Sequence, residues 1–227
     1  MNLLIDIFDF FLPRFCASCK LKLNNNEEIV CMNCMQQIKT VDEERIKYEY
    51  QKKFTDKIII SDFFPLYIFE KDTPLREVIH QLKYNKKFVI GKFLGKKLGS
   101  ALKEKIKDWD IDVIIPVPLH HLKKAERGYN QSLYIAKGIG EELRIKVGSL
   151  IIKRKRFTQS QTTMNKEERE ANIKDAFSMR GKSVIAGKNI LLVDDVITTG
   201  ATIKECGKVL LETGANKVFA ASAAIAD

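Results

Sequence analysis

The chain has 227 residues and carries 39 Lys and Arg against 29 Asp and Glu, giving a net charge of +10. This length accommodates one medium-sized domain and a small additional module, with a sizeable buried core. No apolar run approaches the roughly 18 residues that a membrane-spanning helix needs, so a transmembrane protein is excluded and a cytoplasmic location is expected. The basic surplus favours phosphate-bearing partners but does not identify one.

Residues 1–12 are apolar, but they lack a basic start and contain Asp6 and Asp9, which is atypical of a signal peptide. Leu4 and Phe11 fall on one helical face of this segment. We therefore expect an amphipathic helix that packs against the rest of the protein or against a partner.

Four cysteines form two C-x2-C pairs separated by eleven residues, namely Cys16, Cys19, Cys31 and Cys34. Each pair offers two thiolates to one tetrahedral metal ion. A reducing cytosol disfavours two disulfides, and a redox C-x-x-C would require a thioredoxin-like βαβ context that is missing here. The spacing therefore predicts a structural zinc site. We expect residues 1–55 to comprise the N-terminal helix, this module and a linker, and residues 56–227 to form the main domain.

The main domain is predicted to begin with one or two strands over residues 58–69, broken by Pro65. Thr73 and Pro74 then favour the start of a helix that continues through Leu82.

Residues 83–107 contain nine Lys and a single acid, Glu104, interleaved with aromatic residues that include Tyr84 and Phe88. A basic strip with aromatic residues could bind the backbone and stack the bases of single-stranded nucleic acid. An ordinary amphipathic helix, with Phe88 and Leu94 in the core and the lysines in solvent, explains the pattern equally well. The lysines of the DNA-binding interpretation are Lys83, Lys86, Lys87, Lys92, Lys96 and Lys97.

A second buried strand is predicted over residues 113–118, followed by a basic loop over residues 120–131 and then a helix. The loop residues suited to a phosphate group are Lys123, Lys124, Arg127 and Gly128. The cations match the charge, and the glycine permits close approach of the backbone, although a solvated basic loop is the alternative. The polar, charged segment 153–177 is a candidate flap.

The stretch 189–202 combines a buried strand, an acid pair and a small polar turn. Asp194 and Asp195 stand where the strand is expected to end, and carboxylates placed there can bind hydroxyls or a divalent cation. The turn Thr198–Thr202 and the following helix offer N–H groups to a phosphate. The alternative is a strand, a loop and a helix cap that happens to be acidic. A last apolar strand over residues 218–226 would complete a parallel sheet.

The segment Val193–Thr202 resembles the phosphoribosyl-pyrophosphate (PRPP) motif of the type I phosphoribosyltransferases. The resemblance implies that Asp194 and Asp195 are catalytic and hold the ribose hydroxyls, that the turn holds the 5′-phosphate, and that Mg²⁺ accompanies PRPP. It also implies that the loop with Lys123, Lys124, Arg127 and Gly128 binds pyrophosphate. The PRPP-binding residues would be Val193, Asp194, Asp195, Thr198, Thr199, Gly200, Ala201 and Thr202.

The order of the motifs narrows the resemblance to the ComF family, over nearly the whole chain. The motifs are the four cysteines, Leu82-Lys-Tyr84, Pro116-Val-Pro118, Arg127-Gly-Tyr-Asn-Gln131, the residues Gln161, Arg169, Asn172 and Phe177, and the acid-pair motif. Lys86 stands where the family usually has Gly, and Met164 where it usually has Leu.

This resemblance implies an α/β protein with the type I phosphoribosyltransferase fold, a parallel sheet flanked by helices, and a small N-terminal zinc module. It implies a cytoplasmic competence protein for DNA uptake in natural transformation. Its expected partners are single-stranded DNA, PRPP and other competence proteins at the inner membrane. An active phosphoribosyltransferase acting on an unidentified base or nucleotide-related acceptor is the alternative.

Overall fold

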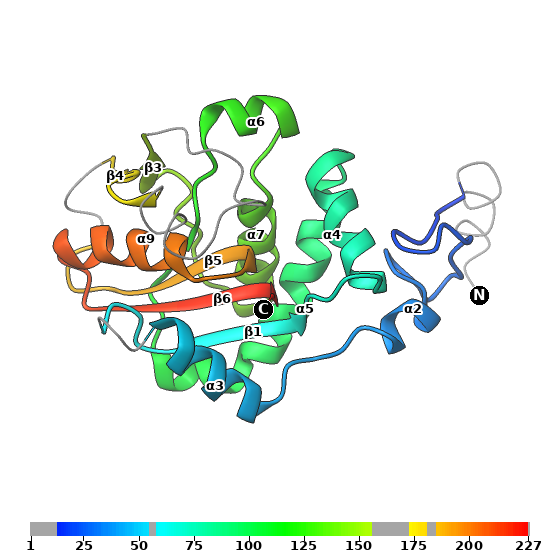
Figure 1. The fold of residues 1–227 in the computed structure, drawn as a ribbon, viewed down its shortest axis with the longest axis horizontal. Coiled ribbons are helices and arrows are strands. Elements are labelled where there is room, and N and C mark those ends of the chain that lie inside the picture. Colours follow the sequence, from blue (N-terminus) through cyan, green and yellow to red (C-terminus); the bar gives the residue numbers. More distant parts are fainter. Residues whose placement is uncertain (1–12, 55–57, 156–172, 181–184, 227) are drawn as a thin grey trace.

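The computed structural model describes residues 13–54, 58–155, 173–180 and 185–226 (Figure 1). Within this part of the chain, a parallel sheet of four strands has the order β1-β6-β5-β2, and a second sheet pairs β3 with β4 in antiparallel orientation. The strands are β1 (Phe63–Ile68), β2 (Val113–Pro116), β3 (Ile152–Arg154), β4 (Phe177–Met179), β5 (Asn189–Ile197) and β6 (Lys217–Ile225). The helices are α2 (Met32–Gln36), α3 (Glu43–Phe54), α4 (Pro74–Tyr84), α5 (Phe88–Trp109), α6 (His121–Arg127), α7 (Gln131–Leu143) and α9 (Ala201–Glu212).

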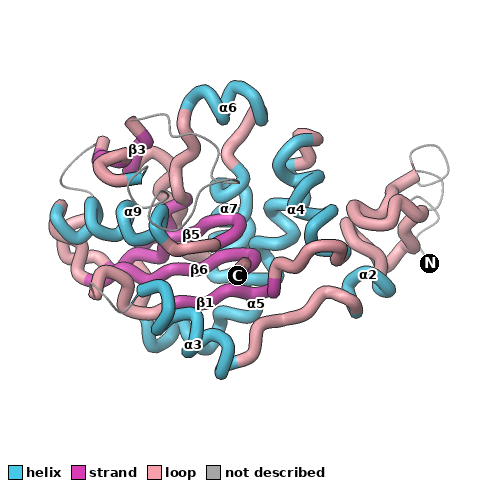
Figure 2. Tube along the Cα trace, in the orientation of Figure 1, coloured by secondary structure: helices cyan, strands magenta, loops and turns pink. Residues whose placement is uncertain are grey.

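Helices cover both faces of the parallel sheet (Figure 2). Along β5, Leu191 and Val193 pack into a core shared with α4, α5 and α7. Ile190 and Leu192 point the other way, into a core shared with α3 and α9. Residues 190–193 are buried on both faces of the sheet, so this part of β5 is an unbroken apolar run, and this confirms the prediction of a buried strand here.

The linker that leaves α2 runs along the outer edge of β1. The N–H of Ile68 donates to the carbonyl of Lys39 at 3.0 Å, and the N–H of Val41 donates to the carbonyl of Leu66 at 3.1 Å. Helix α3 follows, and its last residue, Phe54, packs on Phe63 of β1 with ring centroids 5.3 Å apart. Residues 39–54 are thus packed on the main sheet, while the division at residue 55 stays a prediction.

Three expectations about these elements need correction. Pro65 does not break the first strand, because β1 is an outer strand of the sheet, where a missing N–H is tolerated. Phe88 is 46% exposed rather than core, because it opens α5. Strand β5 continues to Ile197, so it runs past the acid pair, which was expected to stand at its end.

The helix predicted to open at Thr73 and Pro74 is confirmed as α4, and the last strand is confirmed as β6. The predicted N-terminal helix lies outside the described residues, as do residues 156–172 of the predicted flap. The described ends of that flap form the paired strands β3 and β4. No helix in the described ranges has the length and apolar character to cross a membrane.

Candidate functional site

A cleft of about 400 Å³ opens at the carboxyl edge of the parallel sheet. It is lined by residues that follow β2, by the last residues of β5, and by parts of α4, α6, α7 and β3. This edge is where open α/β sheets bind their ligands, because loops and helix N-termini converge there. All the predicted PRPP-motif residues from Asp194 to Thr202 line this cleft, whereas Val193 is buried in the sheet beneath it.

The two acids have different partners within the cleft. Asp195 forms an ion pair with Lys83 of α4, with 3.2 Å between Oδ2 and Nζ. Asp194 accepts a hydrogen bond from the Ser132 hydroxyl, with 2.9 Å between Oγ and Oδ1. Burial, and then the neighbouring Asp195 charge, raise the pKa of Asp194 to about 7. Near neutral pH Asp194 is therefore partly protonated, and its charged form needs nearby cations or hydroxyl donors.

The small polar turn connects β5 to α9, and it packs against Phe54 at the end of α3. Gly200 has φ of +76°, in the left-handed region that favours glycine. A Cβ at this position would stand 2.8 Å from Cε1 of Phe54. The backbone of Gly200 can therefore lie on the Phe54 ring only because no side chain intervenes. The turn leaves Thr198, Thr199 and Thr202 lining the cleft, next to the N-terminus of α9.

The predicted pyrophosphate loop is a short helix, α6, rather than an irregular loop. Lys123 and Arg127 line the cleft, whereas Lys124 is exposed and lies outside the lining. Gly128 ends the helix with φ of +82°. Burial, and then the charges of Arg154 and Arg127, lower the pKa of Lys123. The crowding of these cations favours an anion between them.

Sequence reasoning missed three residues that the fold brings to this cleft. Lys83 was assigned to nucleic acid, yet it lines the cleft and contacts Asp195. Arg154 lines the cleft from β3, and Ser132 reaches Asp194 from α7. Lys83 and Ser132 lie within or directly after motifs that carry the family resemblance, Leu82-Lys-Tyr84 and Arg127–Gln131, and this proximity was the available signal.

The six-lysine strip does not form one surface. Lys83 points into the cleft, while Lys92 lies 2.6 Å and Lys96 3.9 Å from carboxylate oxygens of Glu141 on α7. Lys97 lies over the ring of Phe93, and Lys86 and Lys87 are exposed in the turn between α4 and α5. The fold therefore divides these lysines among several environments.

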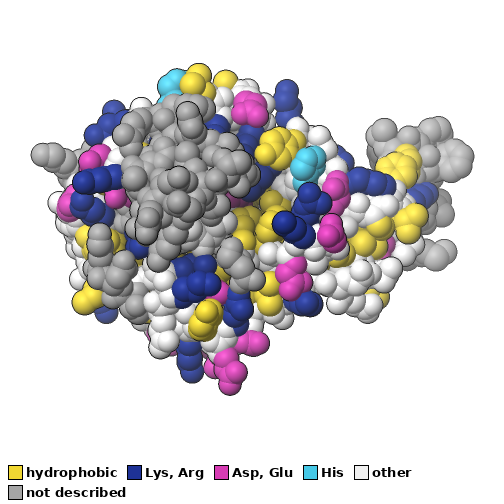
Figure 3. Space-filling model, in the orientation of Figure 1, with side chains coloured by type: hydrophobic (Ala, Val, Ile, Leu, Met, Phe, Trp, Pro, Cys, Tyr) yellow, Lys and Arg dark blue, Asp and Glu magenta, His cyan; other side chains and the backbone are white. Residues whose placement is uncertain are grey.

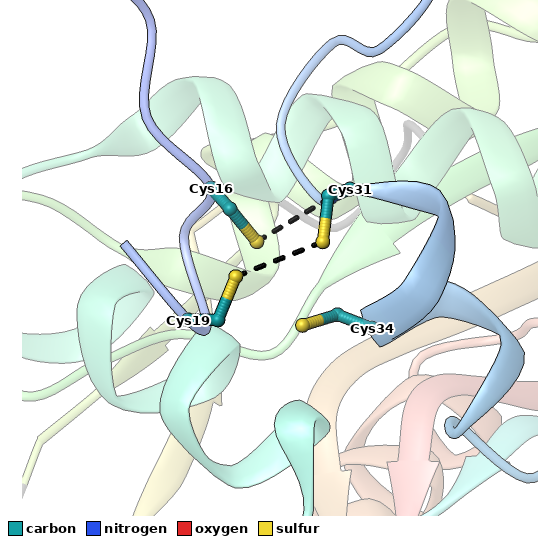
Figure 4. A group of neighbouring side chains, drawn as sticks. All are labelled: Cys16, Cys19, Cys31 and Cys34. Atoms are coloured by element: carbon teal, nitrogen blue, oxygen red, sulfur yellow. Dashed lines mark hydrogen bonds between the residues drawn. The ribbon is translucent and has the colours of Figure 1, made fainter. Parts of the chain in front are cut away.

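The four predicted metal ligands come together in one cluster (Figure 4). All four Sγ atoms lie within 4.8 Å of one another, and those of Cys19 and Cys31 are 3.7 Å apart. Four thiolates around one zinc ion at about 2.3 Å stand roughly 3.8 Å from each other, so the cluster fits a tetrahedral metal site.

Backbone donors favour the thiolate at Cys16, whereas burial raises the pKa of Cys34 to about 12. The N–H groups of Ser18 and Cys31 donate to Sγ of Cys16 at 3.4 and 3.3 Å. Burial disfavours the Cys16 thiolate, but hydrogen bonds from the backbone of Cys31, Cys19 and Ser18 outweigh it and bring the pKa of Cys16 down to about 7. Lys20 joins the module to α4 through an ion pair with Glu77 at 3.0 Å.

Comparisons with known proteins agree with this architecture. Residues 129–226 match the family model described as a phosphoribosyl transferase domain. The chain is 29% identical over 229 residues to Competence protein F of Haemophilus influenzae, covering 93% of this chain and 96% of that protein. It is 30% identical over 164 residues to the DNA utilization protein YhgH of Escherichia coli O6:H1, covering 71% of this chain and 68% of that protein. It is 28% identical over 211 residues to Competence protein ComFC of Streptococcus pneumoniae, covering 89% of this chain and 84% of that protein.

The parallel sheet, the helices on both faces and the acid pair beside the polar turn define a protein with the type I phosphoribosyltransferase fold. The N-terminal cysteine cluster and the similarity along most of the chain narrow this class further. The chain belongs to the ComF family.

Proposed function

We propose that this protein acts in DNA uptake, binding PRPP in the cleft and single-stranded DNA at its surface. The observation that carries the PRPP part is the placement of Asp194, Asp195 and the turn from Thr198 to Thr202 on one cleft. Carboxylates accept hydrogen bonds from ribose hydroxyls, and N–H groups at a helix N-terminus bind phosphate. The names of the relatives, competence protein and DNA utilization protein, support the DNA part.

The cations around the acid pair support the same ligand. Lys83, Lys123, Arg127 and Arg154 all line the cleft. PRPP carries phosphate groups at both ends of a ribose, so it needs positive charge on the side away from the 5′-phosphate turn. Mg²⁺, when bound with PRPP, adds positive charge against the pyrophosphate, and Asp194 and Asp195 are the carboxylates of the described cleft that would hold it.

Calorimetric titration with PRPP and Mg²⁺ tests the cleft. Replacing Asp194 and Asp195 together by Asn should weaken PRPP binding roughly 100-fold or more, because two charge-assisted hydrogen bonds are lost. The matched control is Asp72→Asn with Glu104→Gln, which removes the same charge from two exposed positions. Equal affinity in the parent protein and the acid-pair variant would contradict the assignment.

An active phosphoribosyltransferase is the second candidate, and the four cations of the cleft favour it. A pyrophosphate leaving group that develops negative charge is stabilised by positive groups already in place. The assay is release of pyrophosphate from PRPP in the presence of nucleobases, nucleotides or single-stranded DNA. Release that requires the acid pair would establish transfer chemistry, while tight PRPP binding without release would leave a binding function.

A further inference from the structure

Two exposed aromatic side chains flank the turn between α4 and α5, and the first of them, Tyr84, lines the cleft. Tyr84, the last residue of α4, is 52% exposed and lines the cleft, and Phe88, the first residue of α5, is 46% exposed. Phe88 packs against Tyr134 of α7, with ring centroids 5.0 Å apart. The ring centroid of Tyr84 lies 5.6 Å from Cζ of Arg127. These rings are thus positioned by the fold while much of their surface meets solvent.

Cations surround these rings. Lys86 and Lys87 lie in the turn between the two aromatic residues, and both are exposed. The aliphatic part of Lys86 comes within 3.5 Å of the point where a Cβ would stand on Gly128, so this turn lies against the end of α6. The exposed Lys124 is on that helix. Figure 3 shows hydrophobic side chains beside Lys and Arg side chains over α4 and α6.

The balance of charge differs between this region and the rest of α5. Lys86, Lys87 and Lys124 form no ion pair with another residue in the described ranges, whereas Lys92 and Lys96 share the carboxylate of Glu141. A lysine that already has a carboxylate partner gains less from a phosphate.

We propose that Tyr84, Lys86, Lys87, Phe88 and Lys124, here called the cleft-mouth surface, bind a single strand of nucleic acid at the entrance to the PRPP cleft. The inference rests on the proposed function, and it places the DNA-binding part of that function at a defined surface. Aromatic rings stack on the faces of unpaired bases, which a duplex hides, and the lysines meet the phosphates between them. The remainder of α5 is not part of the surface.

This position brings the two ligands of the protein together. Tyr84 directly follows Lys83, whose ammonium contacts Asp195 inside the cleft. A strand stacked on Tyr84 and PRPP held at Asp195 therefore contact adjacent residues at the end of α4. Any coupling between the two ligands is reciprocal, so each would change the affinity of the other by the same factor.

Two double variants with the same loss of charge test the surface. Lys86→Gln with Lys87→Gln removes two proposed phosphate contacts, and Lys92→Gln with Lys96→Gln removes two lysines that face Glu141. Anisotropy titrations use a labelled oligothymidylate and the full, metal-loaded chain. The first variant should lower the log-log salt slope by about 1.4, which corresponds to roughly 25-fold weaker binding at 0.1 M salt, and the second should remain near the parent protein.

The aromatic part has its own matched pair. Phe88→Ala removes a stacking ring, and Val89→Ala removes an apolar side chain of the same 46% exposure that cannot stack. Phe88→Ala should weaken oligothymidylate binding roughly tenfold or more, and Val89→Ala should not. PRPP affinity, unchanged in all four variants, reports that the domain is folded.

Each outcome has one meaning. If the parent protein binds no single strand, the DNA part of the proposed function fails. If it binds, but Lys92→Gln with Lys96→Gln weakens binding as much as the first variant, the surface is wrong. Equal affinity for a duplex of the same length, or displacement by polyglutamate at equal charge, would overturn the choice of single-stranded nucleic acid as the occupant.

Discussion

The contact between α3 and the small polar turn Thr198–Thr202 predicts that Gly200→Ala is costly for two separable reasons. The φ of +76° places any L side chain in the left-handed region, at a cost of about 1–2 kcal/mol. The new Cβ would also stand 2.8 Å from Cε1 and 3.1 Å from Cζ of Phe54. Phe54 is packed between Tyr50 and Phe63 and is only 1% exposed, so it cannot swing aside. Overpacking of this kind costs about 1–3 kcal/mol.

The expected total is about 2–5 kcal/mol, a large part of the roughly 5–15 kcal/mol that stabilises a typical domain. Urea unfolding measures it. The control is Gly187→Ala, which has φ of +70° and no heavy atom within 4 Å of the new Cβ, so it measures the backbone cost alone. The folded fraction of Gly200→Ala should also bind PRPP more weakly than Gly187→Ala. Equal losses of stability in the two variants would refute the proposed clamp by Phe54.

A double-mutant cycle measures the interaction energy between residue 200 and Phe54. Phe54→Leu shortens the side chain under the turn, so adding it to Gly200→Ala should relieve part of the overpacking, and the two changes should cost less together than the sum of their separate costs. An additive result would mean that the turn adapts without meeting the ring.

Three further predictions concern the acid pair and the cysteine cluster. Because the pKa of Asp194 is raised to about 7, its contribution to folding is complete below about pH 4 and is lost as the pH rises through about 7. Asp194→Asn should therefore be more stable than the parent protein in urea at pH 8 and equally stable near pH 4. A pH-independent difference in stability would count against a raised pKa of Asp194. Lys83→Met removes a charge that lowers the pKa of Asp194. The pH at which PRPP binding reaches half its maximum should therefore move upward. An unshifted midpoint would argue that Lys83 is not close to the acid pair in solution. A zinc chelator should release about one equivalent of metal and expose residues 16–34 to protease, because so small a module has little core without the ion, and continued protection after metal loss would contradict a structural role.

The features that the sequence predicted well are local in the chain. The strand, the acid pair and the turn are contiguous over residues 189–202, so their order alone places them at one sheet edge. The cysteine pairs are likewise close in sequence, and their spacing predicted the cluster that the fold forms. Patterns of this kind can be read from neighbouring residues without knowledge of the tertiary contacts.

The features that were missed depend on contacts between distant segments. Ser132 and Asp194 are 62 residues apart, and no local pattern states that α7 begins beside the end of β5. The environment of Lys92 depended in the same way on the rotation of α5 about its axis, which is set by packing against α7 and brings Glu141 within reach. Sequence periodicity predicts which face of a helix is buried. It does not predict which charged side chains of a neighbouring helix lie beside the edges of that face.

The contacts around the acid pair constrain how any ligand enters the cleft. Asp195 already has Lys83 at Oδ2 and the N–H of Val196 at Oδ1, and Asp194 already accepts from Ser132 and from the N–H of Asp195. A ribose hydroxyl that binds Oδ2 of Asp195 must therefore share that oxygen with Lys83 or replace the ion pair. A ligand that brings only hydroxyls would gain little from this exchange, because Lys83 would lose its carboxylate. A ligand that brings hydroxyls for the carboxylates together with phosphate for Lys83 satisfies both groups at once, and this reciprocity favours PRPP over a simple sugar or a lone phosphate.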